Sequence, residues 1–171
     1  MTIAEDLENQ FKEAFKFPDY VIQIGVVEAD TVRKIDKIKA TKTKKTDEKS
    51  ITNAQLMYIH ENGSYLHHIP KRPVLGMTLE WTDKGSMNKA VDKAFMTYLK
   101  SGKKIDFSKS LQRYCLSQVE VYARDLIYNN DGRLVANSPR TIAMKGFNHP
   151  LFQTGQLARS ITCRLIELNG G

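Results

Sequence analysis

Imidazole side chains are the groups in this sequence best suited to metal chemistry, and there are four of them: His60, His67, His68 and His149. A His-Glu-x-x-His zinc site needs two imidazoles one turn apart on one face of a helix. Gly63 separates His60 from His67, so we expect these two on different elements. Adjacent residues of an extended strand point to opposite sides, which separates His67 from His68. The spacing therefore predicts no metal site and no cofactor.

Other catalytic patterns are also missing from the sequence. Ser101-Gly102-Lys103-Lys104 has a Gly-Lys pair but lacks the first glycine and the final hydroxyl residue of a phosphate-binding loop. There is no G-x-S-x-G elbow, no dinucleotide fingerprint and no clear pair of carboxylates. Cys115 and Cys163 have no metal-binding spacing and are expected to be small buried hydrophobic residues. We therefore expect that the protein is not an enzyme.

Positive charge is concentrated in residues 31–49. Eight basic residues against three acidic ones give this stretch +5 of the net +7 of the chain. The basic residues are Arg33, Lys34, Lys37, Lys39, Lys42, Lys44, Lys45 and Lys49. Without aromatic residues, such a segment can contact phosphate but cannot stack on bases. We expect a mobile basic loop over 31–50, which either is simply solvated or contacts DNA or a protein partner.

The length and composition favour one domain over residues 1–171. A hydrophobic content of 41% is enough for a core. The longest apolar runs span only a few residues, and no secretory leader opens the chain, so we expect synthesis in the cytoplasm and no membrane contact.

The first half of the chain predicts two helices and a strand. Thr2 and Glu5 have capping-box spacing before an amphipathic pattern over 3–16. Residues 20–28 are rich in β-branched side chains and predict a well-covered strand, in which Gly25 could mark a bulge. Thr52 or Asn53 can cap a short helix that ends at Gly63 in a left-handed conformation. Residues 74–81 fit either a strand or the start of a helix.

The second half predicts two longer helices and a closing strand. Ser86 is expected to cap a helix that ends at Gly102, and the next helix is expected to run from near Ser108 to the turn at 129–132. A polar loop follows, then a single helical turn capped by Thr154, then a strand over 161–168. This order predicts an α+β fold in which a small, largely antiparallel sheet packs against two longer helices and an extended basic loop projects. The open edges of a small sheet would suit assembly.

Two short motifs carry a family resemblance. The first runs from Ala54 through His60-Glu61-Asn62-Gly63 to Ile69-Pro70-Lys71-Arg72-Pro73-Val74-Leu75. The second reads Pro150-Leu151-Phe152-Gln153-Thr154-Gly155-Gln156-Leu157-Ala158-Arg159-Ser160-Ile161. In this order, they resemble the signature of tail-completion and head–tail joining proteins of long-tailed bacteriophages, and the anchored resemblance covers residues 50–168.

The motif residues have evident structural uses. Glu61 and Arg72 could form an ion pair across a turn that Pro70 and Pro73 make rigid, and Thr154 could open a tight helix entry with the glycine that follows it. The residues expected to be structural or to lie at interfaces are Glu61, Gly63, Pro70, Arg72, Pro73, Leu151, Thr154, Gly155, Leu157 and Ser160.

The resemblance implies a structural virion protein of the phage neck or tail end. It implies a homo-oligomeric ring, with a hexamer favoured, that contacts the tail-tube protein on one side and head connector or stopper proteins on the other. DNA could pass through its lumen, with the basic loop facing DNA or a partner, and the protein would occupy the host cytoplasm before it joins the virion. A tail terminator, a head–tail joiner and an assembly chaperone all fit the resemblance.

The alternative class of function is a small nucleic-acid-binding protein without sequence specificity. A third class, a small hydrolase or nuclease, would need a metal or nucleophile constellation, which the sequence lacks.

Overall fold

The structure, a computed structural model, describes residues 16–26 and 51–168. The predicted helix over 3–16 lies outside these ranges except for its last residue, Lys16. The basic segment 31–50 and residues 27 and 28 of the predicted first strand also lie outside them. None of the helices in the described ranges is both long and apolar enough to cross a lipid bilayer.

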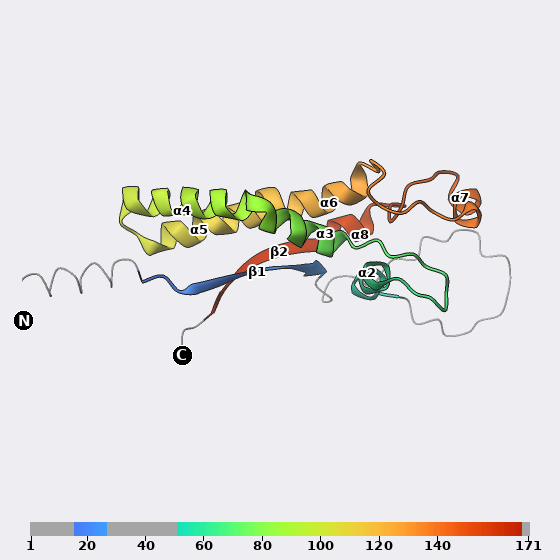
Figure 1. The fold of residues 1–171 in the computed structure, drawn as a ribbon, viewed down its shortest axis with the longest axis horizontal. Coiled ribbons are helices and arrows are strands. Elements are labelled where there is room, and N and C mark those ends of the chain that lie inside the picture. Colours follow the sequence, from blue (N-terminus) through green and yellow to red (C-terminus); the bar gives the residue numbers. More distant parts are fainter. Residues whose placement is uncertain (1–15, 27–50, 169–171) are drawn as a thin grey trace, which may run out of the picture.

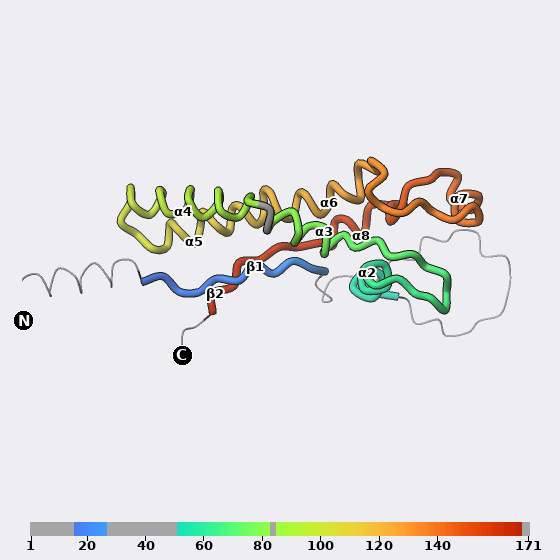
Figure 2. Tube along the Cα trace, in the orientation of Figure 1, coloured from blue at the N-terminus to red at the C-terminus, as the bar shows by residue number. Residues whose placement is uncertain are grey.

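The sheet pairs the first described strand with the last. Strand β1 (Asp19–Val26) runs antiparallel to β2 (Ile161–Leu168), in a register that joins Asp19 to Leu168 and Val26 to Ile161 (Figures 1 and 2). Both predicted strands are confirmed. The register continues through Gly25 without interruption, so the expected bulge is wrong. Burial alternates along β1, because only one of its faces is covered, whereas the sequence suggested a well-covered strand.

Two long helical segments cover the inner face of this sheet (Figure 1). The first consists of α3 (Val74–Trp81), the π-helical turn η2 (Thr82–Ser86) and α4 (Met87–Ser101). The second consists of α5 (Lys104–Tyr114), the π-helical turn η3 (Cys115–Val119) and α6 (Glu120–Tyr128). Gly102 joins them in a left-handed conformation, and its N–H donates to the carbonyl of Tyr98. The α+β class and the pair of longer helices are confirmed.

Three details of these helices differ from the sequence expectations. Residues 74–81, which fitted a strand or a helix, are helical. Ser86 does not cap a helix start but lies in helical conformation inside the first segment, where its hydroxyl donates to the Thr82 carbonyl at 3.2 Å. The second helix begins at Lys104 rather than near Ser108.

Three short helices complete the fold: α2 (Asn53–Asn62), α7 (Pro139–Lys145) and α8 (Gln156–Arg159). Thr52, one of the two caps that the sequence offered, caps α2, and it does so through a reciprocal capping box with Gln55. Gly63 ends α2 with φ 73° but ψ 177°, so its backbone is extended rather than left-handed helical. The chain then turns back through an antiparallel bridge between Ser64 and Ile69. Helix α7 lies in the stretch that was expected to be a polar loop.

The core is made of three adjoining clusters. The largest lies where α2, α3, α6, α8 and β2 meet; the second joins α4 to α5; the third packs η3 against β2. Phe17, just before β1, extends the second cluster, and its ring centroid lies 4.5 Å from that of Phe107. The sheet and the helical hairpin are thus held together along their length.

Candidate functional site

The two sequence motifs meet in the largest core cluster. Met57 and Val74 from the first motif pack with Leu157 and Ile161 from the second, and all four side chains are buried. Burial of this apolar area fixes α2, α3 and α8 against one another and against α6. Figure 1 shows α2 and α7 gathered at the same end of the molecule, beyond the tip of the sheet.

Glu61 caps the N-terminus of α3 from a neighbouring helix. Its carboxylate oxygens accept hydrogen bonds from the main-chain N–H groups of Leu75 at 3.0 Å and Gly76 at 2.6 Å. Pro73, at the start of α3, provides no side-chain cap. A negative charge at this position complements both the unpaired N–H groups and the helix dipole. Glu61 therefore joins the end of α2 to the start of α3.

Arg72 joins the first motif to the segment before α7. Its side chain donates hydrogen bonds to the carbonyl oxygens of Val135 at 2.7 Å and Ala136 at 2.8 Å, and Nη1 lies 3.4 Å from Nδ1 of His60. Arg72 is only 5% exposed, and desolvation by burial lowers its pKa. The guanidinium is thus used to satisfy main-chain carbonyls inside the protein.

The expected ion pair between Glu61 and Arg72 is wrong. The two side chains have separate partners: one caps a helix and the other holds a loop. Each satisfies main-chain groups that would otherwise be left without hydrogen bonds, and this need determines their placement.

The second motif makes a tight turn before α8. Gly155 begins the helix with φ 73° and ψ 4°, and a Cβ atom there would lie 2.9 Å from Nη1 of Arg159. Thr154 does not cap the helix; instead its carbonyl accepts a hydrogen bond from Arg159 at 3.0 Å. The hydroxyl of Ser160 donates to the carbonyl of Leu157 at 2.7 Å at the end of the same turn. Leu151, at φ 59°, adds a second left-handed residue just upstream.

A hollow of about 370 Å³ lies between the two motifs. It is bordered by the first motif at His60, Ile69, Pro70 and Arg72, and by the second at Leu151, Phe152 and Gln153. Helix α7 and its approach, a stretch predicted to be a loop, close the hollow with Asn137, Ser138, Thr141 and Lys145. Ser138 before Pro139, with Gly146 at the other end, was the signal that could have located this helix.

Lys145 is the second cation at the hollow, and it is also used internally. Its ammonium donates to the carbonyl oxygens of His149 at 2.8 Å and of Phe152. Desolvation and, to a lesser extent, the nearby charge of Arg72 lower the pKa of Lys145. Both cations therefore brace loops around the hollow.

The histidines do not form a metal site in the described part of the chain. Three of them, His60, His67 and His68, border the hollow, but no cluster of three or more metal-binding side chains is found among the described residues. His67 and His68 lie in a turn, with His68 at φ 52°, and not in the extended strand expected from sequence. Nε2 of His149 lies 2.6 Å from the carbonyl of Ile127, and its ring stacks on Phe152.

The two cysteines are free and buried, as expected, and lie in one cluster between η3 and β2. A hydrogen bond with Cys115, together with burial, raises the pKa of Cys163. Its thiol therefore stays protonated and is a poor nucleophile.

The fold and the site define a small α+β protein in which two sequence motifs brace one end of a two-stranded sheet and its helical hairpin. Comparison with known proteins gives no match to any family, to any curated protein or to any solved structure.

Proposed function

We propose that this protein is a structural component of the neck or tail end of a long-tailed bacteriophage, where it forms a ring that completes the tail and joins it to the head connector. The observation that carries the proposal is the pairing of the two motifs. They match the tail-completion signature in type and order, and their buried residues pack against each other in one cluster. The motif residues thus define the structure of one end of the molecule, which is the role expected of them in a protein that assembles with others.

Exposed apolar side chains at the same end support this proposal. In the turn that follows α2, Tyr65 is 98% exposed and Leu66 is 81% exposed. Helix α2 adds a surface of Ala54, Tyr58 and Ile59 with the polar Gln55 between them, and Ile51, just before the helix, extends it. Apolar side chains so exposed contribute little to the fold of one subunit and are typical of contact surfaces.

The sheet offers a second means of contact. Among the described residues, β1 and β2 pair only with each other, so each strand has one edge without a partner strand. Such an edge can pair with a strand of a neighbouring subunit. In the proposed ring, the basic segment 31–49 would line the lumen or face an acidic partner, and repetition around the ring would multiply a weak contact.

Electron microscopy tests the proposal directly. The purified protein would be imaged alone and mixed with phage tail tubes, with its mass followed by light scattering over a range of concentrations. Closed rings, or caps at the ends of tubes, are the expected result. A protein that remains monomeric at every concentration and leaves the tube ends bare would contradict it.

A further inference from the structure

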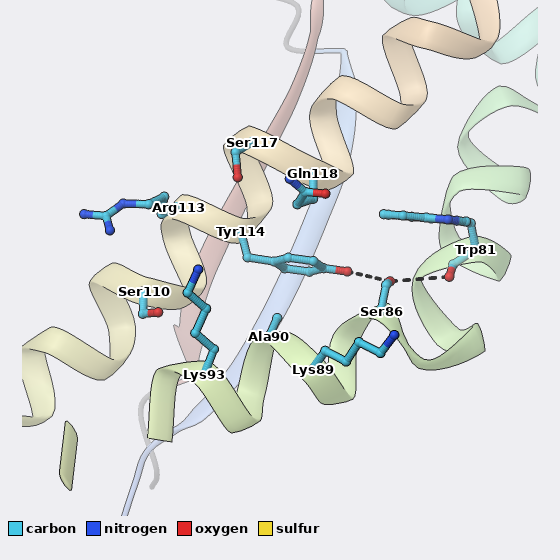
Figure 3. Close-up of a pocket in the computed structure, with 10 residues that line it drawn as sticks. All are labelled: Trp81, Ser86, Lys89, Ala90, Lys93, Ser110, Arg113, Tyr114, Ser117 and Gln118. Atoms are coloured by element: carbon cyan, nitrogen blue, oxygen red, sulfur yellow. Dashed lines mark hydrogen bonds between the residues drawn. The ribbon is translucent and has the colours of Figure 1, made fainter. Parts of the chain in front are cut away.

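A second pocket lies between the two long helical segments, on the side of the hairpin away from the motif cluster. Its volume is about 290 Å³, close to the lower limit for small-molecule sites. Trp81, Ser86, Lys89, Ala90 and Lys93 border it from the first segment. Ser110, Arg113, Tyr114, Ser117 and Gln118 border it from the second (Figure 3).

The pocket exists because the facing side chains are small and because the two segments are held apart. Ala90, Ser110 and Ser117 all border the gap, where larger residues would fill the space. Both π-helical turns contribute to its wall, Ser86 from η2 and Ser117 from η3. The hydroxyls of Ser86 and Tyr114 lie 2.7 Å apart and join the two segments at the floor, as Figure 3 shows. Single π-helical turns are found often at functional sites.

Charge and aromatic surface are combined in this pocket. Lys89 and Lys93 lie one turn apart on α4, whereas the guanidinium of Arg113, on α5, points away from the centre of the pocket (Figure 3). Among the described residues that border the pocket, none is acidic. The two lysines create a positive potential at the rim of a partly apolar cavity, where Trp81 and Tyr114 offer aromatic surface.

We propose that this pocket binds a nucleotide unit, with its phosphate held by Lys89 and Lys93 and its base packed against Trp81 and Tyr114. Lysine ammonium groups bind phosphate as point charges, and stacking on aromatic side chains is how proteins bind bases without sequence preference. A free nucleotide and a single strand of nucleic acid present the same chemistry. A carboxylate-rich peptide would use the cations but would leave the aromatic wall without a matching group.

Trp81 gives a direct readout, because it is the single tryptophan of the chain. Its fluorescence would be followed while thymidine monophosphate, an oligothymidylate or a blunt DNA duplex is added to the full-length protein, with correction for ligand absorption. We expect saturable quenching by the oligonucleotide, with an affinity that falls as salt is raised, since phosphate contacts release counterions.

Two sets of variants locate the site. Replacing the exposed pair on α4, Lys89→Gln and Lys93→Gln, should weaken binding at least fivefold. Lys100→Gln on α4 with Lys109→Gln on α5 removes equal charge outside the pocket and should change binding less than twofold. Ala90→Leu should fill the cavity and abolish quenching. The melting temperature of this variant would be measured alongside, and if Ala90→Leu proves unstable, the lysine variants decide the result.

The ligand series separates the outcomes. Quenching by the mononucleotide as well as the oligonucleotide supports a nucleotide site, and quenching by the oligonucleotide alone supports a single-strand site. No saturable quenching, stronger binding of the duplex than of the single strand, or equal binding of polyglutamate would overturn the proposal. The measurement does not depend on ring formation, so the virion role and this site can fail separately.

Discussion

Arg72 shows how a charged motif residue can serve the fold. Its guanidinium is buried and bonded to two main-chain carbonyls of the approach to α7. The guanidinium of arginine presents N–H donors on separate nitrogens in a fixed planar fork, so Nε and Nη2 of Arg72 each reach a different carbonyl. The cost of desolvating the charge is offset only while these bonds are present.

We predict that Arg72→Met lowers the free energy of unfolding by about 2–4 kcal/mol, because two part-buried hydrogen bonds from a charged donor to the carbonyls of Val135 and Ala136 are lost. Urea denaturation monitored by circular dichroism would measure it. The exposed Arg140→Met is the control and should change the same quantity by less than about 0.5 kcal/mol. Equal effects of the two variants would show that Arg72 does not brace the loop.

Gly155 gives a second test at this scale. Gly155→Ala should destabilise the protein by about 1–2 kcal/mol, since its φ of 73° disfavours a side chain and the new Cβ would crowd Arg159 and Tyr128. Gly25→Ala is the matched control: a Cβ there meets nothing within 4 Å, so stability should hold or rise slightly. Thermal melts of both variants would compare them, and a Gly155 variant as stable as the Gly25 variant would rule out this role.

At the scale of elements, α3 depends on a cap supplied by another helix. Its first turn has no side-chain cap of its own, and Glu61 at the end of α2 accepts hydrogen bonds from two of its N–H groups. The first motif therefore couples the stability of α2 and α3, and explains why an acidic residue is useful so near the end of a helix, where the dipole disfavours it.

Removing this cap should cost more than neutralising it. Glu61→Ala is expected to lower the free energy of unfolding by about 1–2 kcal/mol, and Glu61→Gln by about half as much, because an amide keeps one acceptor oxygen. Asp92→Asn, an exposed acid within α4, is the control and should have little effect. Chemical denaturation of the three variants would check this order; an Ala variant equal to the control would refute the cap.

Local sequence signals predicted the elements whose ends are determined locally. The cap of α2 at Thr52, the end of α4 at Gly102 and the closing strand over 161–168 all correspond to observed boundaries. Helix α7 was missed because Ser138, Pro139 and Gly146, which mark its two ends, are also common in loops. The helix also has no buried residue, so its sequence lacks the apolar spacing that predicts a helix.

The tertiary contacts of the motif residues were not predictable in the same way. Opposite charges suggested that Glu61 would pair with Arg72, but each was recruited by main-chain groups whose positions only the folded chain defines. The second pocket was missed for a similar reason. Trp81 and Tyr114 are far apart in sequence and border one pocket only because the two long segments pack as a hairpin with two π-helical turns.

At the scale of the whole molecule, the exposed apolar turn after α2 allows the proposed assembly to be tested without changing the stability of the fold. The double variant Tyr65→Ser, Leu66→Ser should leave the free energy of unfolding of the monomer within about 0.5 kcal/mol, because these side chains are already in water, yet it should reduce oligomer formation. Light scattering and chemical denaturation of the same samples would measure the two effects.

The control is Leu99→Ser and Met96→Ser, exposed apolar residues on α4 at the opposite end of the molecule (Figure 1). If these changes reduce oligomer formation as much as the turn variant does, or if neither variant reduces it, the turn is not a subunit contact.

The pairing of β1 with β2 also has a consequence for biosynthesis. These strands bracket almost the whole described chain, so β1 leaves the ribosome long before its partner has been translated. The helical hairpin has local contacts and can form early, but its apolar inner face and the nascent β1 must wait for β2. During that interval, the incomplete polypeptide exposes both an apolar surface and an unpaired strand, and is therefore a substrate for chaperones. A ribosome that stalls or terminates before residue 161 would release a chain that has β1 but no β2, and such a chain cannot close its sheet.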